Sequence, residues 1–337
     1  MGRLTARQRT LGLIGAGRIA AVHAGNAARA GLRLVCVADV VADAARALAE
    51  ASGSEAADPD TLLARADVDA VLIATPPDTH DALVVAAAEA GKQVFCEKPL
   101  AQTVEGARRA VDACDRAGVV LQVGYNRRFD RNFRAVRDAV RAGRVGDPWI
   151  LRISSRDPAP PPGGYLPLSG GLFLDTTSHD LDLARYVIGA DILEVTARAA
   201  SLVDPNAAEI GDVDTAVVSL VFSNGAVGAI DNCRVSAYGY DQRLEVHGSR
   251  GMAQAGNELS STATVADAEG FHAPPLPHFY MERYAPAFAR ELESFAAALA
   301  GAEPEVSGRD GLAAVVAATA AKRALDENRV VRLDETG

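Results

Sequence analysis

Two segments of this chain carry residues whose types and spacing suit the transfer of protons and charge. The first is Cys96–Leu100, at the end of a short apolar run, and the second is Gly170–Asp182, a polar stretch with a histidine. If the second segment starts a helix, Asp175 and His179 lie four residues apart on one face, whereas Asp180 points away and is solvated. A carboxylate beside an imidazole orients the ring and supports its cation, so the histidine would act as a general base near neutral pH.

Lys98, in the first segment, follows a predicted strand of a parallel sheet. Ligands of such sheets bind beside the carboxyl ends of the strands, and Pro99 restricts the residue before it to an extended backbone. A lysine held there can donate to a hydroxyl oxygen and stabilise negative charge that develops on it. The alternative interpretations are that Lys98 is a solvated charge, that Asp175 only caps a helix, and that His179 fills a polar gap.

A glycine-rich turn near the N-terminus is suited to binding a pyrophosphate. The apolar run Leu11–Ile14 leads into Gly15–Ala20, which has the pattern G-x-G-x-x-A. Gly15 permits a tight turn, Gly17 lets the backbone approach the phosphates, and the small Ala20 lets helix and strand pack closely. A helix that begins at this turn would direct its free N–H groups at the phosphates.

Asp39 indicates which dinucleotide the turn would bind. It follows the apolar run Leu34–Ala38 and lies about 20 residues beyond Gly17, where a carboxylate accepts hydrogen bonds from both ribose hydroxyls of NAD. A carboxylate there repels a 2′-phosphate, and neither Val40 nor Val41 supplies a compensating cation. The pattern therefore favours NAD over NADP as the cofactor.

The elements that must position these residues change character along the chain. Up to residue 125, short apolar runs alternate with Ala-rich helical segments such as Ala42–Ala51 and Asp78–Ala90, which predicts a doubly wound parallel sheet. The predicted strands are Leu11–Ile14, Leu34–Ala38, Ala70–Ala74, Val94–Cys96 and Val119–Val123. An NAD-binding domain over residues 1–125 is the resulting expectation.

Residues 126–337 are expected to form a second, substrate-binding and oligomerisation domain. An Asn-Gly pair between two alternating runs is a strong hairpin signal, so this part predicts a largely antiparallel sheet with helices on one face. The fold class is thus α/β, with a parallel and a largely antiparallel open sheet. The predicted strands are Trp149–Ser154, Val213–Phe222, Val227–Val235 and Arg243–His247; the predicted helices are Arg131–Ala142, Asp175–Ile188, Glu282–Ala300 and Arg309–Leu325; and the proline-rich Asp157–Gly164 is irregular.

The bulk properties exclude several classes of protein. A net charge of −10 argues against nucleic acid or anionic membranes as partners, and no apolar run is long enough to cross a bilayer. The first ten residues lack the apolar stretch of a secretory signal. The 4 cysteines form no Cys-x-x-Cys pair, so we expect reduced thiols, no metal site and a cytoplasmic location.

Taken together, the motifs resemble those of the glucose–fructose oxidoreductase, inositol dehydrogenase and MocA (Gfo/Idh/MocA) family over nearly the whole chain. The resemblance rests on Gly15–Ile19 with His23, Thr75–His80, Glu97–Pro99, and the block containing Gly171, Asp175, His179 and Asp180. Within the family the chain is most similar to inositol 2-dehydrogenases, on the segments Gly124–Asp130, Ser155–Pro158 and Tyr238–Asp241.

The resemblance implies a Rossmann domain, a C-terminal α/β domain with an open sheet, and a homo-tetramer built through those sheets. It implies NAD-dependent oxidation of one hydroxyl of a cyclic polyol, with myo-inositol converted to 2-keto-myo-inositol. The implied catalytic residues are Lys98, Asp175 and His179; those along the cofactor are Gly15, Gly17, Arg18, Ile19, Asp39, Thr75, Pro76, His80, Glu97 and Lys98; those on the polyol are Arg127, Asp157, Tyr238 and Tyr240.

Several alternatives stay open at this point. Ala20 stands where many relatives have a third glycine. Residues Thr176–Ser178 are polar here, whereas some relatives have more apolar residues at these positions, and this difference bears on which substrate is bound. The chain could act on another sugar or inositol isomer, or be a non-catalytic NAD(P)-binding regulatory protein. Arg127 could serve a salt bridge, and Tyr238 and Tyr240 could pack at a strand end.

Overall fold

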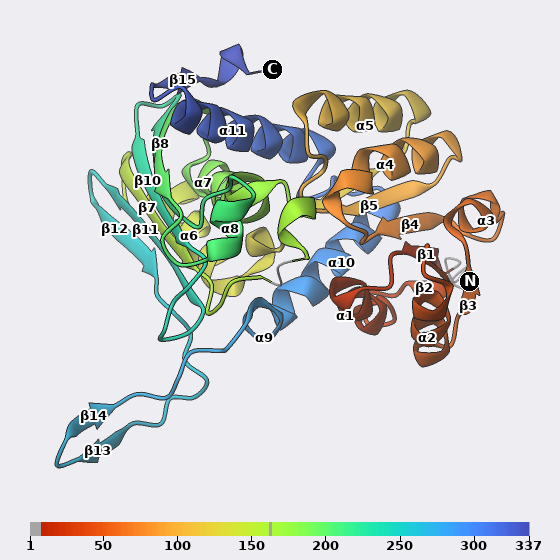
Figure 1. The fold of residues 1–337 in the computed structure, drawn as a ribbon, viewed down its shortest axis with the longest axis horizontal. Helices are drawn as coiled ribbons and strands as arrows, with labels where there is room; N and C mark the ends of the chain where they lie inside the picture. The colour runs from red at the N-terminus through yellow and green to blue at the C-terminus, as the bar shows by residue number, and fades with distance from the viewer. Residues whose placement is uncertain (1–7, 162–163, 337) are drawn as a thin grey trace, which may run out of the picture. The chain divides into compact units, whose positions relative to one another are not determined.

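The computed structural model describes residues 8–161 and 164–336, so part of the predicted proline-rich segment and the first seven residues lie outside it. Contacts divide the chain into two compact units (Figure 1). The first is Met1–Asn126 with Pro286–Leu312, and the second is Arg127–Ala285 with Ala313–Gly337. The segment 286–312, which the sequence analysis assigns to the second domain, therefore belongs by its contacts to the first unit.

The first unit contains a 6-stranded sheet in the order β3-β2-β1-β4-β5-β6, and every pairing in it is parallel. This is the dinucleotide-binding order, in which ligands bind where the strand order reverses, beside β1 and β4. The predicted parallel sheet is confirmed, although the three-residue β3 was too short to predict. The strands are β1 Thr10–Ile14, β2 Arg33–Ala38, β3 Glu55–Ala57, β4 Ala70–Ile73, β5 Gln93–Glu97 and β6 Leu121–Gly124.

Helices cover this sheet and complete its core. Leu292, Phe295 and Leu299 of α10 belong to the same buried cluster as Leu11 and Phe95 of the sheet, which explains why α10 joins the first unit. The helices are α1 Arg18–Ala27, α2 Ala42–Ser52, α3 Pro59–Ala64, α4 His80–Glu89 after the 3₁₀ turn Pro77–Thr79, α5 Val104–Ala117 and α10 Ala285–Leu299.

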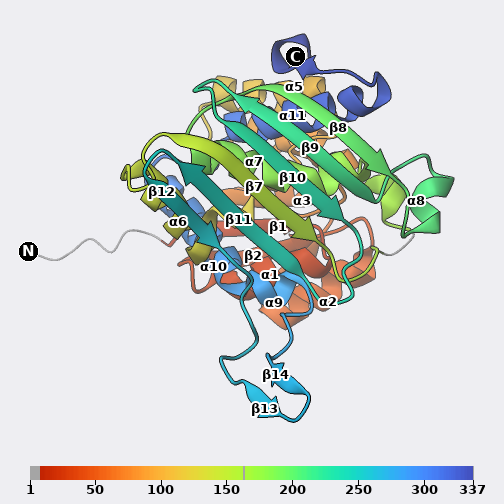
Figure 2. The same ribbon diagram turned by 90° about the vertical axis from the view of Figure 1, so that its left-hand side faces the viewer.

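The second unit is built on a 7-stranded sheet in the order β12-β11-β7-β10-β9-β8-β15, in which only β7 and β10 pair in parallel. Its residues alternate between buried and exposed, as in a sheet covered on one face, and Figure 2 shows the uncovered face. The strands are β7 Pro148–Arg156, β8 Ile192–Ala200, β9 Thr215–Phe222, β10 Val227–Cys233, β11 Asp241–Gly248, β12 Gly251–Ala255 and β15 Val331–Arg332. The expected Asn-Gly hairpin joins β9 to β10, with Gly225 at φ 86°.

Helices pack on the other face of this sheet, and a separate hairpin extends from it (Figures 1 and 2). The helices of this part of the chain are α6 Arg131–Arg141, α7 Ser178–Ile188, α8 Pro205–Glu209, α9 Tyr280–Arg283 and α11 Gly308–Asp326. Of these, α6 and α7 contact strands of the sheet, and the hairpin pairs β13 Val265–Asp267 with β14 Gly270–His272. Before α7, the residues Phe173–Thr177 form a π-helical turn, where the sequence analysis expects the start of a regular helix.

Two further findings bear on the sequence expectations. Over the described ranges 8–161 and 164–336, no helix is both long and apolar enough to span a bilayer. The thiols of Cys36, Cys96 and Cys114 are buried and that of Cys233 is half-buried, and none of the four forms a disulfide within those ranges.

Candidate active site

The turn between β1 and α1 has the geometry of a phosphate-binding turn. Gly15 has φ 107°, its N–H donates to the Ala38 carbonyl at 2.8 Å, and a Cβ there would lie 2.5 Å from the carbonyl oxygen of Ala74. Gly17 precedes α1, whose first N–H groups donate to no capping side chain. A Cβ on Gly17 would meet open space. Folding therefore requires glycine at position 15, whereas glycine at position 17 leaves room for a ligand to approach the helix N-terminus.

Asp39 is fixed beside this turn, just after β2. Its Oδ2 accepts from the backbone N–H of Ala16 at 2.7 Å and its Oδ1 from that of Val41 at 2.8 Å. The next residues, Val40 and Val41, are 91% and 56% exposed but uncharged, so they present no cation for a 2′-phosphate. This donor and acceptor set fits NAD, because a fixed carboxylate at the end of β2 can accept from ribose hydroxyls. Arg18 and Ile19 form the first turn of α1.

The loops after β4 and β5 are tied together by a buried histidine. His80 is 0% exposed; its Nδ1 lies 2.7 Å from the carbonyl oxygen of Pro99 and its Nε2 lies 2.9 Å from that of Thr75. Burial lowers the pKa of His80. The Thr75 hydroxyl is 2.7 Å from that of Thr79, while Pro76 is exposed. His80 thus lies between the two loops, with one ring nitrogen within hydrogen-bond distance of a backbone carbonyl of each.

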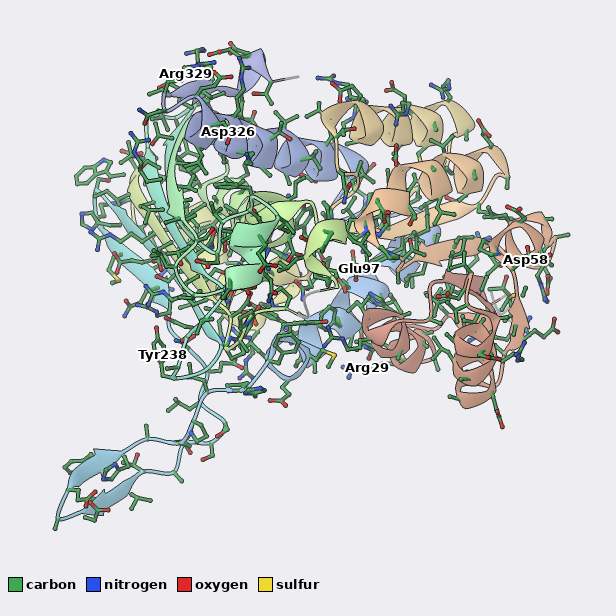
Figure 3. All side chains as sticks on the ribbon, in the orientation of Figure 1. Arg29, Asp58, Glu97, Tyr238, Asp326 and Arg329 are labelled. Atoms are coloured by element: carbon green, nitrogen blue, oxygen red, sulfur yellow. The ribbon has the colours of Figure 1, made fainter. Side chains whose placement is uncertain are left out.

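Glu97, labelled in Figure 3, ends β5, and Lys98 follows it. The Glu97 Oε2 accepts from the Lys98 backbone N–H at 3.2 Å, and its Oε1 lies 2.6 Å from Nε2 of His23. Lys98 is half-buried. The predicted position of this lysine at the carboxyl end of a parallel strand is therefore confirmed.

Asp175 and His179 lie on the π-helical turn and at the start of α7 in the second unit. Asp175 accepts from the Tyr165 hydroxyl at 2.9 Å through Oδ1 and from Arg234 Nη1 at 3.1 Å through Oδ2. Burial, and next the Asp175 charge, raise the pKa of Tyr165. Sequence reasoning missed both partners; the signal that could have identified Arg234, which is 1% exposed in the structure, is an arginine directly after an alternating strand.

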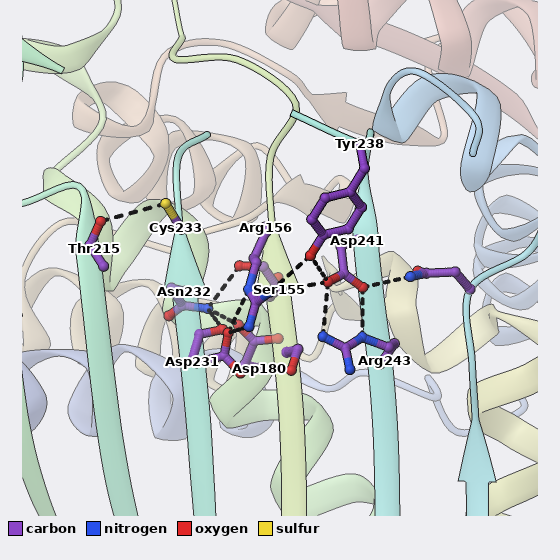
Figure 4. Close-up of polar contacts among 12 residues, drawn as sticks. Ser155, Arg156, Asp180, Thr215, Asp231, Asn232, Cys233, Tyr238, Asp241 and Arg243 are labelled. Atoms are coloured by element: carbon purple, nitrogen blue, oxygen red, sulfur yellow. Dashed lines mark hydrogen bonds and ion pairs between the residues drawn. The ribbon is translucent and has the colours of Figure 1, made fainter. Parts of the chain in front are cut away.

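The prediction that Asp180 is solvated is wrong. Asp180 is 0% exposed and accepts from Asn232 Nδ2 at 2.8 Å (Figure 4). It also forms an ion pair with Arg127, whose Nη2 donates to the Ser155 hydroxyl at 2.9 Å. Although burial alone would lower the pKa of Arg127, the Asp180 carboxylate holds it above its ordinary value. The error has a physical reason: α7 packs on β7, so the side of the helix that Asp180 occupies faces the sheet.

The remaining predicted polyol contacts fall into two environments. Tyr240 is 5% exposed, with its ring edge-on to Tyr284 at 6.0 Å, and burial raises its pKa. Asp157 acts electrostatically on both Tyr240 and Arg127, so these three predicted residues lie near one another. Tyr238, in contrast, is 57% exposed and belongs to a network of charged side chains.

That network lies on the face of the sheet opposite α7, because its strand residues alternate with the buried ones. The Tyr238 hydroxyl donates to Asp241 at 2.6 Å and accepts from Arg156 at 2.8 Å, and Arg156 also pairs with Asp231 (Figure 4). The hydrogen bonds of Tyr238 therefore hold it in this network and not beside Tyr240.

Comparisons with known proteins agree with this architecture. The family model described as "Oxidoreductase family, NAD-binding Rossmann fold" matches residues 9–125, and the "GFO/IDH/MocA C-terminal domain" matches residues 133–254. The chain is 45% identical to a myo-inositol 2-dehydrogenase of Thermotoga maritima over 334 residues, which cover 96% of this chain and 98% of the relative. It is 46% identical to an inositol 2-dehydrogenase of Rhizobium meliloti over 324 residues, covering 96% and 98%.

Two solved structures are similar over the same extent. A probable dehydrogenase from Thermotoga maritima has a TM-score of 0.94 at 44% identity, covering 97% of this chain and 100% of that chain. The scyllo-inositol dehydrogenase from Lactobacillus casei with bound NAD(H) and scyllo-inositol has a TM-score of 0.90 at 28% identity, covering 97% and 100%. With its glycine turn, its fixed Asp39 and both family domains in place, this chain belongs to the Gfo/Idh/MocA family of NAD-binding oxidoreductases.

Proposed function

We propose that this protein oxidises one hydroxyl of a cyclic polyol to a ketone, with myo-inositol as substrate and 2-keto-myo-inositol as product. The observation that carries the proposal is near-full-length identity of about 45% to proteins named inositol 2-dehydrogenases, in a chain that has Lys98, Asp175 and His179. A non-catalytic regulatory protein, which is the alternative, would be expected to have lost such residues.

The residues of the first unit suit NAD binding. Gly15 and Gly17 with the N-terminus of α1 would hold the pyrophosphate, and Asp39 would accept from the adenosine ribose. The other residues of the predicted cofactor set are Arg18 and Ile19 at the start of α1 and Thr75, Pro76, His80, Glu97 and Lys98 at or after the ends of β4 and β5. The bound cofactor supplies the hydride acceptor for the reaction.

We assign the proton and charge transfers to three side chains. His179 accepts the proton of the reacting hydroxyl, and Lys98 donates to the same oxygen and stabilises the negative charge that develops on it. Asp175, held by Tyr165 and Arg234, supports the His179 imidazolium. A positioned general base typically contributes on the order of 10²–10⁴ in rate.

The ring of the substrate has several hydroxyls, so selecting one carbon requires fixed partners for the others. The shared environment of Arg127, Asp157 and Tyr240 supports their assignment to the polyol, with Arg127 acting from within its ion pair to Asp180. Tyr238 is proposed as a fourth contact, and its network with Arg156 is the competing interpretation.

A substrate panel tests the proposal directly. Purified protein with NAD is offered myo-inositol, scyllo-inositol, other isomers and hexoses, and NADH absorbance is followed; we expect turnover of myo-inositol and none of glucose. Turnover of glucose alone would overturn the substrate assignment. The His179→Ala variant should bind NAD with unchanged Kd and lose on the order of 10²–10⁴ in kcat. Near-normal turnover by this variant would remove His179 from the mechanism.

We also propose that the protein is a homo-tetramer, associated through the uncovered face of the second unit's sheet, and that it is cytoplasmic. Val217 is 52% exposed and Val227 is 47% exposed on that face, and exposed apolar patches of this kind mark protein interfaces. Light scattering during size-exclusion chromatography should give the tetramer mass, and Val217→Lys should reduce it. The unpaired cysteines support a reducing compartment, which cell fractionation tests.

A further inference from the structure

A buried cluster of two carboxyl groups and an imidazole lies inside the first unit, and two of its three members, His23 and Glu291, have no part in the proposed chemistry. His23 of α1, Glu97 of β5 and Glu291 of α10 are 1%, 7% and 0% exposed. One polar atom from each lies within 4.8 Å of the others. The rings of Phe95 and Phe288 pack edge-on against His23, with centroids at 5.3 and 6.0 Å. In such surroundings, each ionisable group must have a defined proton or partner.

Glu97 has the partners that a buried carboxylate requires. Its Oε1 lies 2.6 Å from His23 Nε2, and its Oε2 accepts from the Lys98 backbone N–H at 3.2 Å. Gly124 pairs with Glu97 across β5 and β6, and a Cβ on Gly124 would lie 3.0 Å from that Oε2. The carboxylate is therefore confined against the β6 backbone, and hydrogen bonds to an ionised acceptor are among the stronger ones in proteins.

Glu291 has no such partners. Neither of its carboxyl oxygens accepts a hydrogen bond from a described residue, and its Oε1 is 3.9 Å from His23 Nε2, beyond hydrogen-bond reach. A buried carboxylate without donors takes up a proton instead of staying charged. Burial, with added repulsion from Glu97, raises the pKa of Glu291 well above its ordinary value.

The proton arrangement on His23 follows from its two ring nitrogens. Nε2 contacts the Glu97 carboxylate, while Nδ1 is buried and has no hydrogen-bond partner among the described residues. A neutral ring with its proton on Nε2 satisfies the carboxylate and leaves only a lone pair on Nδ1. A zinc ion, with bonds of about 2.0–2.2 Å to nitrogen and oxygen in a tetrahedral arrangement, needs its ligand atoms roughly 3.3 Å apart. The observed 2.6 Å is a hydrogen-bond distance, shorter than the separation of two ligand atoms on one zinc ion, so the geometry favours protons over a metal in this cluster.

We propose that neutral His23 is a positioning residue: it donates to ionised Glu97 and so holds the Glu97–Lys98 peptide that presents Lys98, while Glu291 stays protonated beside them. The assignment of Lys98 to catalysis rests on the proposed function, but the proton positions do not. Two experiments therefore separate the two proposals.

Infrared spectroscopy of the protein without substrate tests the proton positions. Wild-type protein at neutral pH should show the carbonyl stretch of a buried protonated carboxylic acid. This band should disappear in Glu291→Gln and remain in Glu97→Gln, which is the matched control in the same cluster. Absence of the band from wild type, its loss in Glu97→Gln, or one equivalent of tightly bound zinc by elemental analysis would overturn the proposal.

Kinetics with inositol tests the positioning role. His23→Leu removes the donor to Glu97, and we expect kcat to fall about 10–100-fold while the Kd for NAD changes by less than about threefold, since misplacing a reacting group costs turnover. His23→Gln keeps an N–H donor near the Nε2 position and should recover kcat to within about threefold of wild type, as should Glu291→Gln.

Normal kcat in His23→Leu, or an equal loss in His23→Gln or Glu291→Gln, would contradict the positioning role. Melting temperatures of all variants show whether a loss of activity reflects unfolding. If wild type itself turned over no polyol, the proposed function would fail, and the infrared result would still decide the proton positions.

Discussion

The buried ion pair of Arg127 with Asp180 allows a structural prediction that can be worked out in magnitude. The side chain of Asp180 is fully buried and that of Arg127 is 4% exposed. In Asp180→Ala, the guanidinium stays buried with the Ser155 hydroxyl at 2.9 Å as a neutral partner, and Asn232 loses its acceptor at 2.8 Å. Removing one partner of a buried pair costs roughly 3–5 kcal/mol, because the other charge remains uncompensated.

This free energy corresponds to a large thermal shift. In domains of about 150–250 residues, 1 kcal/mol changes the melting temperature by roughly 2–4 °C, so Asp180→Ala should melt about 6–20 °C below wild type. The Arg127→Met/Asp180→Leu double variant removes both charges and should recover most of that loss. Asp191→Ala is the matched control, since it breaks the exposed pair with Arg185 at the other end of the α7 region and should cost at most a few degrees.

Calorimetry at neutral pH on the four proteins gives the comparison. If Asp180→Ala melts within about 2 °C of Asp191→Ala, the pair does not hold the second unit together, and the reasoning from burial is refuted. A double variant that melts as low as the single one would show that packing, not charge, dominates this site. KM for myo-inositol in the double variant then reports whether Arg127 also contacts the polyol.

Three further predictions concern the cofactor turn and acid stability. Gly15→Ala should lower both the melting temperature and NAD affinity, because the glycine has φ 107° and a Cβ would lie 2.5 Å from a carbonyl oxygen. Gly17→Ala should melt like wild type and weaken only NAD binding measured by calorimetric titration; equal melting losses in both would contradict the distinction. Asp39→Ser with Val40→Arg should raise the ratio of kcat/KM for NADP over NAD by at least about tenfold, and an unchanged ratio would show that other residues set cofactor choice. Burial alone would raise the pKa of Asp214, but hydrogen bonds from three backbone N–H groups and a hydroxyl hold it below its usual value. The ionised Asp214 therefore stabilises the folded protein fully above the ordinary aspartate pKa, and this stabilisation is lost as pH falls through the lowered pKa. The difference in unfolding free energy between wild type and Asp214→Asn, measured by urea titration, should be full at neutral pH and shrink below about pH 4. A difference independent of pH would be inconsistent with this.

Local patterns in the sequence were sufficient for the nucleotide turn and the parallel sheet. The conformations of Gly15 and Gly17 depend on a few neighbouring residues, and Asp39 follows at the spacing set by one strand–helix–strand unit. Lys98 could be placed at a strand end for the same reason. These features depend on the spacing of residues along the chain, which can be recognised without knowing which elements pack together.

Contacts between distant segments were not predictable in this way. The four-residue spacing of Asp175 and His179 says which residues share a face but not which face is buried, so Asp180 was wrongly expected in solvent. Tyr238 and Tyr240 are two residues apart, yet one is exposed and the other buried, because both lie in the turn between β10 and β11, where no strand period fixes the direction of a side chain.

By itself, then, the sequence determined the parallel nucleotide-binding sheet and the preference for NAD, because each depends on short-range spacing and backbone conformation. Only the tertiary structure decided which charges are buried and what neutralises them. His23 meets Glu97 across 74 residues of chain, and α10 brings Glu291 beside both from a segment expected in the other domain. Burial of a charge depends on every element packed around it, and the spacing of residues along the chain does not reveal that packing.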